Sequence, residues 1–165
     1  MTAVVEACIS LGANLGDAQA TVGQALACLA ADPEISRLRA SPLYRSAPWG
    51  RQDQPDFINA CACFVTGLTP LALLEKLQAL ELAHGRQRLP GGHWGPRTLD
   101  LDLLLYGEQV IDLPQLQVPH RWMHARAFVL VPLADIAADA VIVGHGRVAD
   151  LLGGLDTSQV VQIGG

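Results

Sequence analysis

Lysine is almost absent from this chain of 165 residues: Lys76 is the only one, and the other ten cations are arginines. The phosphate-binding loop G-x-x-x-x-G-K-[ST] requires a lysine after its second glycine, so the sequence excludes that motif. Positive charge is scarce overall, since 11 Lys and Arg stand against 16 Asp and Glu and the formal net charge is −5. Nucleic-acid backbones and anionic membranes are bound through positive fields, so neither is expected as a partner.

Cysteine is sparse as well, and its spacing fits no covalent framework. Cys8, Cys28, Cys61 and Cys63 form neither a disulfide pattern nor the C-x-x-C pairs of structural zinc sites. Cys61 and Cys63 alternate with alanines, so on a strand both would point to one face. We therefore predict buried free thiols that pack as small hydrophobic side chains.

No apolar run is long enough to cross a membrane. The longest, residues 127–143, is interrupted by Pro132, Asp135 and Asp139, whereas a spanning helix needs about 20 apolar residues. Residues 1–6 also lack the basic segment of a secretory signal peptide. These absences predict a cytoplasmic protein.

The sequence contains enough apolar residues to form one hydrophobic core. Half of the residues are hydrophobic, and no linker, repeat or low-complexity tract divides the chain. Residues 1–165 are therefore predicted to form a single domain. Apolar patterns, cap residues and turn signals predict its elements. Strands are expected over 4–11, 35–44, 57–66, 98–106 and 108–111, and helices over 18–31, 70–83, 126–137 and 148–152.

The order of these elements is β-α-β-β-α-β, with further elements appended. Two helices on one face of an antiparallel sheet, the ferredoxin-like α+β arrangement, is the simplest packing of that order. Residues 46–56 and 86–97 form two loops that are rich in polar residues, Pro and Gly and are long for such a domain. Long loops of this kind tend to be lids or binding loops, so we expect both to border the site.

The segment 98–104 carries the most chemical information. On a strand, Asp100 and Asp102 share one face with Cα atoms about 6.6 Å apart, and the leucines at 99, 101, 103 and 105 fill the other face. Two adjacent carboxylates among leucines repel each other unless a cation compensates. Mg²⁺ takes carboxylate oxygens and completes its shell with phosphate oxygens. The pair therefore indicates a metal–phosphate site, and a solvated face of an edge strand is the alternative.

Arginines surround this pair in the sequence. Arg86, Arg88 and Arg97 precede the strand, and Arg121 and Arg126 follow it. Guanidinium groups bind phosphate through paired donors and stay charged at working pH. An arginine loop that leads into two aspartates suits a Mg²⁺–polyphosphate substrate, because phosphoryl transfer needs mainly positioning and charge neutralisation. A solvated charged loop is the alternative.

Histidines and aromatic rings lie near the same segments. His120 and His124 have i, i+4 spacing, but Arg121 stands where a zinc-protease motif needs Glu, so a two-histidine zinc site is not predicted. A phosphate-facing His120 fits its arginine neighbours, with a structural role as the alternative. Aromatic residues that can stack a flat heterocycle, or simply pack a lid, also gather here. They are Tyr44, Trp49, Phe57, Trp94, Trp122 and Phe128.

Together these motifs resemble those of the 6-hydroxymethyl-7,8-dihydropterin pyrophosphokinase family. The resemblance rests on S-L-G-A-N-L-G-D at 10–17, Q-D-Q-P-D-F-I-N-A at 52–60 and W-G-P-R-T-L-D-L-D at 94–102, followed by V-P-H at 118–120 and R-A-F at 126–128. It covers nearly the whole chain in the family's order. It implies a ferredoxin-like α+β fold and transfer of the terminal diphosphate of ATP to the hydroxymethyl group of the pterin, with release of AMP. A monomer is the family expectation.

The resemblance also implies roles for individual residues. Asp100 and Asp102 would bind two Mg²⁺ ions, and Arg86 and Arg97 would neutralise the group in transfer. The residues implied in ATP binding are Glu81, Arg88, Trp94, Leu103, His120, Arg121 and Arg126. Those implied in pterin binding are Ser46, Ala47, Trp49, Phe57, Asn59 and Phe128. The chain departs from the family pattern at His93, Arg121, Ala47 and Trp49, and the 86–97 loop is slightly longer; these changes bear on rate, affinity and loop closure.

Two other functions fit part of this pattern. A two-metal phosphohydrolase or nuclease acting on a nucleotide-like substrate would use the aspartates and arginines, but it gives no reason for Phe57, Asn59 and a stacking pocket. A regulatory ligand-binding module of the same fold would not need two buried aspartates. Release of AMP that depends on the pterin separates all three functions.

Overall fold

A six-stranded antiparallel sheet forms the centre of the fold. The structure, a computed structural model, describes residues 4–47, 55–84 and 98–163. The sheet order is β10-β3-β4-β1-β5, and β2 also pairs with β4. The strand bounds are β1 Val5–Ala13, β2 Ile35–Ala40, β3 Leu43–Ser46, β4 Phe57–Thr66, β5 Asp100–Tyr106 and β10 Val160–Ile163.

Strands β2 and β3 act as one strand with a break at Pro42. Both pair with β4, β2 beside its second half and β3 beside its first half. Proline has no N–H to donate to a ladder, and Ser41 maintains the link across the break. Its N–H donates to the Cys61 carbonyl and its hydroxyl accepts the Cys61 N–H, both at 2.9 Å. Counted as one strand, β2 and β3 complete the predicted ferredoxin-like βαββαβ order, which is confirmed.

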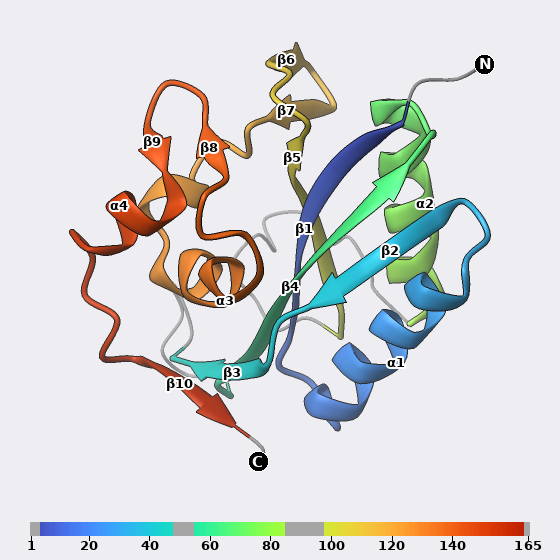
Figure 1. Cartoon of the computed structure of the whole chain (residues 1–165). Coiled ribbons are helices and arrows are strands. Elements are labelled where there is room, and N and C mark those ends of the chain that lie inside the picture. Colours follow the sequence, from blue (N-terminus) through green and yellow to red (C-terminus); the bar gives the residue numbers. More distant parts are fainter. Residues whose placement is uncertain (1–3, 48–54, 85–97, 164–165) are drawn as a thin grey trace.

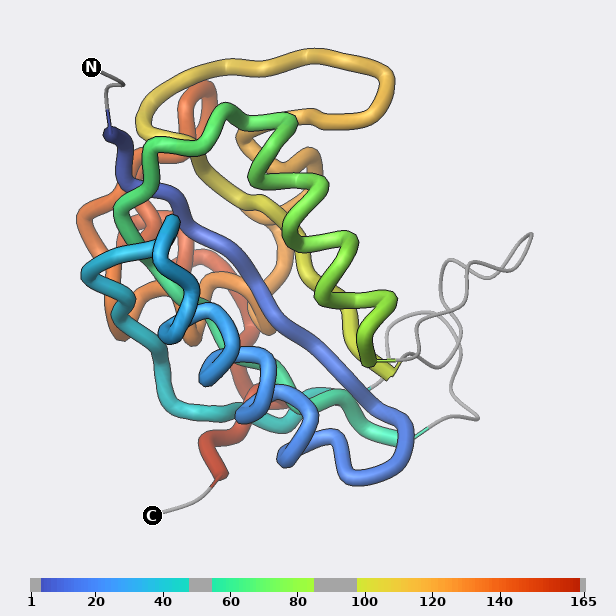
Figure 2. Tube along the Cα trace, turned by 90° about the vertical axis from the view of Figure 1, so that its right-hand side faces the viewer, coloured from blue at the N-terminus to red at the C-terminus, as the bar shows by residue number. Residues whose placement is uncertain are grey.

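Two long helices cover one face of the sheet, as predicted. They are α1 Ala18–Ala31 and α2 Pro70–Ala83, and Figure 2 shows them side by side along this face. Each begins at a side-chain cap, because Asp17 accepts the Ala20 N–H at 3.1 Å and Thr69 accepts the Ala72 N–H at 3.2 Å. Their inner faces pack on a core that includes Ile9, Leu11, Phe64, Leu73 and Leu77.

The appended C-terminal elements cover the other face of the sheet (Figure 1). They are α3 Ala127–Ala137, β8 Val141–Ile142, β9 Gly146–Arg147 and α4 Val148–Leu152. With the short 3₁₀ helix η1, Met123–Ala125, they enclose a second core that contains Cys8, Cys61 and Cys63. The prediction of buried free thiols is confirmed for these three residues. It is wrong for Cys28, which is exposed because the buried stripe of α1 consists of Val22, Ala25 and Leu29.

Two strand predictions need correction. Residues 108–111 do not return as a strand; instead β6 Ile111–Leu113 pairs with β7 Leu116–Val118 in a separate hairpin. Leu105 does not share a face with Leu103, because the register with β1 shifts between Cys8 and Ile9. This β-bulge turns Leu105 into the second core, whereas Leu99, Leu101 and Leu103 pack in the first.

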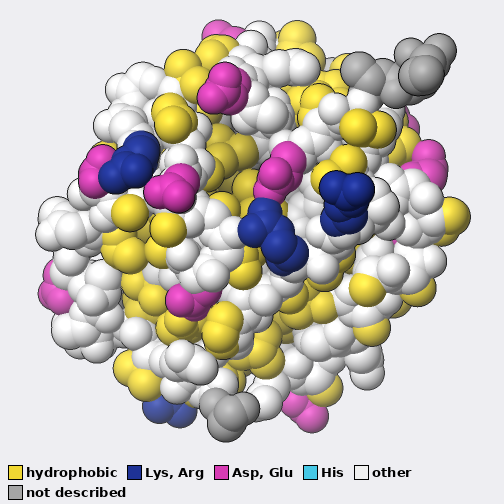
Figure 3. All heavy atoms as spheres, in the orientation of Figure 1, with side chains coloured by type: hydrophobic (Ala, Val, Ile, Leu, Met, Phe, Trp, Pro, Cys, Tyr) yellow, Lys and Arg dark blue, Asp and Glu magenta, His cyan; other side chains and the backbone are white. Residues whose placement is uncertain are grey.

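The charged side chains on one face of the molecule and the lengths of its helices can be described directly. On the face shown in Figure 3, acidic and basic side chains lie next to one another and form no broad basic area. Within the described ranges, no helix has the length and apolar content needed to span a membrane.

Candidate active site

Residues on four neighbouring strands, three of them with polar side chains, form a row on the α3 side of the sheet. Asp100 on β5 pairs with Gly12 on β1, Gly12 pairs with Asn59 on β4, and Asn59 pairs with Tyr44 on β3. Residues directly opposite on antiparallel strands project to the same face. The sheet therefore brings a carboxylate and an amide to one surface, although they are more than 40 positions apart in the sequence.

A second row lies one step further along the strands. Asp102 pairs with Ser10, and Ser10 pairs with Cys61. Asp100 and Asp102 thus project side by side to this face, as predicted, and both side chains are partly buried. The next residue of β4 on this face is the buried thiol of Cys63, so the polar site ends where the second core begins.

Arg126 and His120 face the aspartate pair. Burial lowers the pKa of the Arg126 guanidinium, and the charges of Asp102 and Asp100 oppose that shift. Burial lowers the pKa of His120 to about 4, assisted by Arg126 and opposed by Asp100. His120 is therefore neutral near pH 7. Its Nδ1 accepts the Trp122 N–H at 3.3 Å, so the proton of the neutral ring resides on Nε2.

The predicted pterin residue Asn59 is buried and held in place. Its Nδ2 donates to the Ser46 hydroxyl at 2.6 Å, and both residues are only 6% exposed. Its Oδ1 lies beside Gly12, where an added Cβ would come within 3.3 Å. The missing side chain at Gly12 therefore keeps open the space between Asn59 and Asp100.

The other predicted pterin residues that the structure describes lie on or next to β3, β4 and α3. Phe57 pairs with Ser46 at the start of β4, and both project to the same face as Asn59. Phe128 lies in the first turn of α3, with the Arg126 guanidinium carbon 5.7 Å from its ring centre. The start of α3 lies over β4, since Cys61 Sγ is 3.5 Å from the Val129 carbonyl oxygen. Ala47 is exposed just beyond β3.

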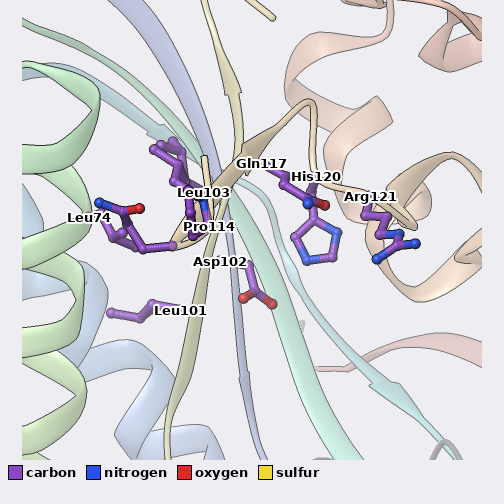
Figure 4. A pocket seen from close by; sticks show the side chains of 10 residues that line it. Leu74, Leu101, Asp102, Leu103, Pro114, Gln117, His120 and Arg121 are labelled. Atoms are coloured by element: carbon purple, nitrogen blue, oxygen red, sulfur yellow. The ribbon is translucent and has the colours of Figure 1, made fainter. Parts of the chain in front are cut away.

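A cavity of about 380 Å³ adjoins Asp102 on the side of the β6–β7 hairpin. Three predicted ATP residues, Leu103, His120 and Arg121, line it together with Asp102. Figure 4 shows the Asp102 carboxylate and the His120 ring directed toward a common space. Arg121 lies beyond His120, with its guanidinium carbon 5.1 Å from the centre of the Trp122 ring.

Glu81, which the motif match assigns to ATP binding, contacts the backbone of β5. It lies in the last turn of α2 and is 3% exposed. Its Oε2 accepts the Leu101 N–H at 2.8 Å, on the peptide between the two aspartates.

Several predicted site residues lie outside the described residues. These are Trp49 in the first long loop and Arg86, Arg88, Trp94 and Arg97 in the second. The predicted closure of residues 86–97 over ATP also falls there. The roles of these residues therefore stay predictions.

The structure adds three contributors that the sequence reading did not single out. Gly12 lies within β1, where a strand glycine signals close approach of a neighbour. Asn14 is 2% exposed and its Nδ2 donates to the Pro55 carbonyl at 3.0 Å, which ties the segment before β4 to the end of β1. The hairpin residues 114–117 line the cavity beside Asp102. The Pro-Gln pair between Leu113 and Leu116 could have indicated the turn of this hairpin, but the strand was expected earlier, over 108–111.

The chemistry of the donor set suits a magnesium ion that is completed by a substrate. In the described ranges, no group of three or more His, Cys, Asp and Glu side chains could by itself hold a metal. Asp100 and Asp102 offer carboxylate oxygens on one face. Mg²⁺ is commonly bound by one or two carboxylates, with waters and substrate phosphates in the remaining positions. The residues present therefore fit a metal that arrives with a polyphosphate.

The carboxylate pair of this ferredoxin-like α+β domain, with Arg126 and His120 near it, is compatible with an enzyme that transfers phosphoryl groups. The chain belongs to the 7,8-dihydro-6-hydroxymethylpterin-pyrophosphokinase family, whose model matches residues 8–138. The family resemblance predicted from the motifs is thus confirmed. Membership makes the chain a pyrophosphokinase of folate biosynthesis, and it gives no support to the phosphohydrolase alternative.

Curated relatives match over most of the chain. The 2-amino-4-hydroxy-6-hydroxymethyldihydropteridine pyrophosphokinase of Pseudomonas aeruginosa is 49% identical over 144 residues, covering 87% of this chain and 88% of the relative. The enzyme of the same name from Methylorubrum extorquens is 45% identical over 161 residues, covering 97% and 99%.

Solved structures of larger proteins share the fold. The structure described as Plasmodium falciparum HPPK-DHPS wild type with pteroate matches with a TM-score of 0.71 at 13% identity. The match covers 93% of this chain and 43% of that one. This chain thus spans less than half the length of that protein, and the likeness shows the fold alone.

Proposed function

We propose that this chain transfers the terminal diphosphate of ATP to the hydroxymethyl group of 6-hydroxymethyl-7,8-dihydropterin and releases AMP. The observation that carries the proposal is the polar row on the α3 side of the sheet, where Asp100, Gly12 and Asn59 occupy adjacent strands. A carboxylate pair for the polyphosphate and a buried amide for a heterocycle thus share one surface. A phosphohydrolase would need only the carboxylates.

Asp100 and Asp102 are the residues that would hold two Mg²⁺ ions. When bound, the ions would neutralise phosphate charge and ease deprotonation of the attacking hydroxyl group. Arg126 adds a positive charge on the same side, as its electrostatic coupling to both aspartates supports. His120 contributes a neutral N–H donor from Nε2, because its Nδ1 is already engaged by the Trp122 N–H.

Asn59 would hydrogen-bond the edge of the pterin ring. Its amide orientation is set by Ser46, so the site does not need to order this side chain when the pterin binds. Phe57 and Phe128 would contact the ring faces, and Ala47 and Trp49 would border the pocket. These assignments follow the motif matches, and those of Asn59, Phe57 and Phe128 agree with the side chains that β4 and α3 present to this surface.

The remaining assignments concern the nucleotide. Leu103, His120 and Arg121 line the cavity beside Asp102, which supports an ATP site there. Arg86 and Arg97 would neutralise the diphosphate in transfer, with Arg88 and Trp94 contacting ATP, as the W-G-P-R-T-L-D-L-D match suggests. We further propose that the protein works as a single-domain monomer in the cytoplasm, which size-exclusion chromatography with light scattering and cell fractionation would test.

The direct test is a product analysis of the purified chain with ATP, Mg²⁺ and the pterin. The expected products are AMP and the pterin diphosphate in equal amounts, with no AMP formed when the pterin is omitted. Asp100→Ala serves as the control for a contaminating kinase. Release of inorganic phosphate or pyrophosphate at the same rate with and without the pterin would contradict the proposal.

A further inference from the structure

Strand β5 carries both aspartates, but only one of its edges is paired. In the sheet order β10-β3-β4-β1-β5 its single strand neighbour is β1, for the residues that the structure describes. Successive N–H groups of an antiparallel strand point alternately toward and away from a given neighbour. Every second N–H of β5 therefore points to the open edge, where a buried donor without a partner costs about 1–3 kcal/mol.

The open-edge N–H between the two aspartates is bound by Glu81. Leu101 donates to Glu81 Oε2 at 2.8 Å, so its N–H points away from β1. By the same alternation, the N–H groups of Asp100 and Asp102 point toward β1, where these residues pair with Gly12 and Ser10. The Asp-Leu-Asp backbone is thus held from both edges.

The properties of Glu81 suit this contact. Its side chain is 3% exposed at the end of α2, a helix that packs against β5. A carboxyl oxygen can accept a backbone N–H whether the group is ionised or protonated. Leu101 itself points into the first core, away from the face that bears the aspartates. Glu81 can therefore fix the peptide without occupying the site.

We propose that Glu81 is a positioning residue that acts through the Leu101 peptide. Its carboxylate fixes the direction in which Asp100 and Asp102 project, so that both can engage metal-bound polyphosphate at once. This role is distinct from the direct ATP contact that the motif match implies for Glu81, and the two roles predict different results. It rests on the proposed function for its catalytic consequence, whereas the backbone contact itself can be tested without turnover.

The experiment compares Glu81→Ala with Glu81→Gln, whose amide oxygen can still accept the Leu101 N–H. Glu75→Ala is the matched control, because Glu75 is an exposed glutamate on the same helix. Hydrogen exchange of the Leu101 amide is followed by NMR in each protein. We expect exchange at least tenfold faster in Glu81→Ala, and within threefold of the unsubstituted protein in Glu81→Gln and Glu75→Ala.

Metal dependence gives the second measurement. Mn²⁺ binding in the presence of a non-hydrolysable ATP analogue is followed by electron paramagnetic resonance, and AMP formation is titrated with Mg²⁺. In Glu81→Ala, we expect at least a tenfold rise in both the Mn²⁺ dissociation constant and the half-saturating Mg²⁺ concentration. Pterin affinity measured without nucleotide should change less than twofold, and Glu81→Gln should recover most of the metal affinity.

Two results would overturn the proposal. One is an unchanged Leu101 exchange rate in Glu81→Ala. The other is an equal loss of ATP affinity in the Ala and Gln variants with unchanged metal dependence, which would identify Glu81 as a direct nucleotide ligand. If Glu81→Ala does not fold, the Gln variant decides through the same measurements. Absence of AMP formation in the unsubstituted protein would refute the proposed function but leave the exchange and Mn²⁺ results to test Glu81.

Discussion

The amide of Asn59 and the hydroxyl of Ser46 lie 2.6 Å apart across the β3–β4 pair, and both are almost fully buried. Since Nδ2 donates to Ser46, the amide plane of Asn59 is fixed. Its Oδ1 is left beside Gly12, on the side of the aspartate strand. The site therefore contains a preset hydrogen-bonding group of the kind that a flat heterocycle needs.

Replacement of Asn59 should weaken binding of the pterin much more than binding of ATP. We expect Asn59→Ala to weaken pterin binding by about 1–3 kcal/mol, because polar groups of the bound ring lose their partner. ATP binding should change little. Isothermal titration calorimetry with each ligand measures both effects, and Ser46→Ala should give a smaller loss by releasing the amide without removing it. Equal losses for pterin and ATP would contradict the assignment.

A methyl group at Gly12 should reduce the space between Asn59 and Asp100. The added Cβ of Gly12→Ala would lie 3.3 Å from Asn59 Oδ1, which is tight, and Ser46 restrains the side chain that would have to move. We expect roughly tenfold weaker pterin binding, about 1.4 kcal/mol. Gly23→Ala is the control, because nothing lies within 4 Å of a Cβ there. Its effect should be a gain in helix stability of up to about 1 kcal/mol with unchanged pterin affinity.

Neutral replacements of the aspartates should remove activity and spare the fold. Asp100→Asn and Asp102→Asn keep the side-chain shape on β5 but remove the charge that a divalent cation needs. We expect AMP formation to fall roughly 10²–10³-fold or more, as for other groups that stabilise charge in a transition state. The melting temperature should stay the same or rise, since the repulsion between the two carboxylates is relieved. Near-normal turnover of either variant in Mg²⁺ would refute the metal assignment.

Local signals in the sequence account for most of the fold. The helix bounds at 18–31 and 70–83 were predicted correctly because Asp17 and Thr69 are side-chain caps and Asp32-Pro33 ends the first helix. The bulge at Leu104, opposite Cys8 and Ile9, could not be predicted in this way, because it depends on how β1 and β5 align across almost 100 residues. The same holds for Cys28, whose exposure depends on the direction in which α1 packs.

As with the fold, the parts of the site that could be predicted from the sequence are those whose signal lies within one element. Asp100 and Asp102 could be singled out because a strand period of two puts them on one face. The open space at Gly12 could not, since it requires the register that brings Asn59 and Asp100 to either side of this glycine. The backbone contact of Glu81 likewise joins a helix end to a strand edge 20 residues away. No periodicity within one element encodes such a contact.

The hydrogen bond from Tyr44 to Asp135 should support the pterin side of the site. Tyr44 is 6% exposed, its hydroxyl donates to Asp135 Oδ2, and burial with this carboxylate raises the pKa of Tyr44 to about 12. The bond joins β3, which carries Ser46, to α3, which carries Phe128. We expect Tyr44→Phe to lower the free energy of unfolding by about 1–3 kcal/mol, with weaker pterin binding. Urea denaturation of Tyr44→Phe, Asp135→Asn and the double variant measures the coupling; purely additive effects would contradict it.

Neutral His120 should make the stability of the protein depend on pH below neutrality. Its pKa is about 4 in the folded chain, against 6.5 for an ordinary histidine, so the unfolded chain binds the proton more readily. The stabilisation is therefore complete above pH 6.5 and is lost as the pH falls toward 4. Since one pKa unit corresponds to 1.36 kcal/mol, about 2–3 kcal/mol should disappear between pH 7.5 and 4.5. Urea denaturation at both pH values, compared with His120→Gln, isolates this contribution from the other titrating groups. The Gln variant should lose correspondingly less stability over this range, and equal losses in the two proteins would show that His120 is not held neutral by its burial.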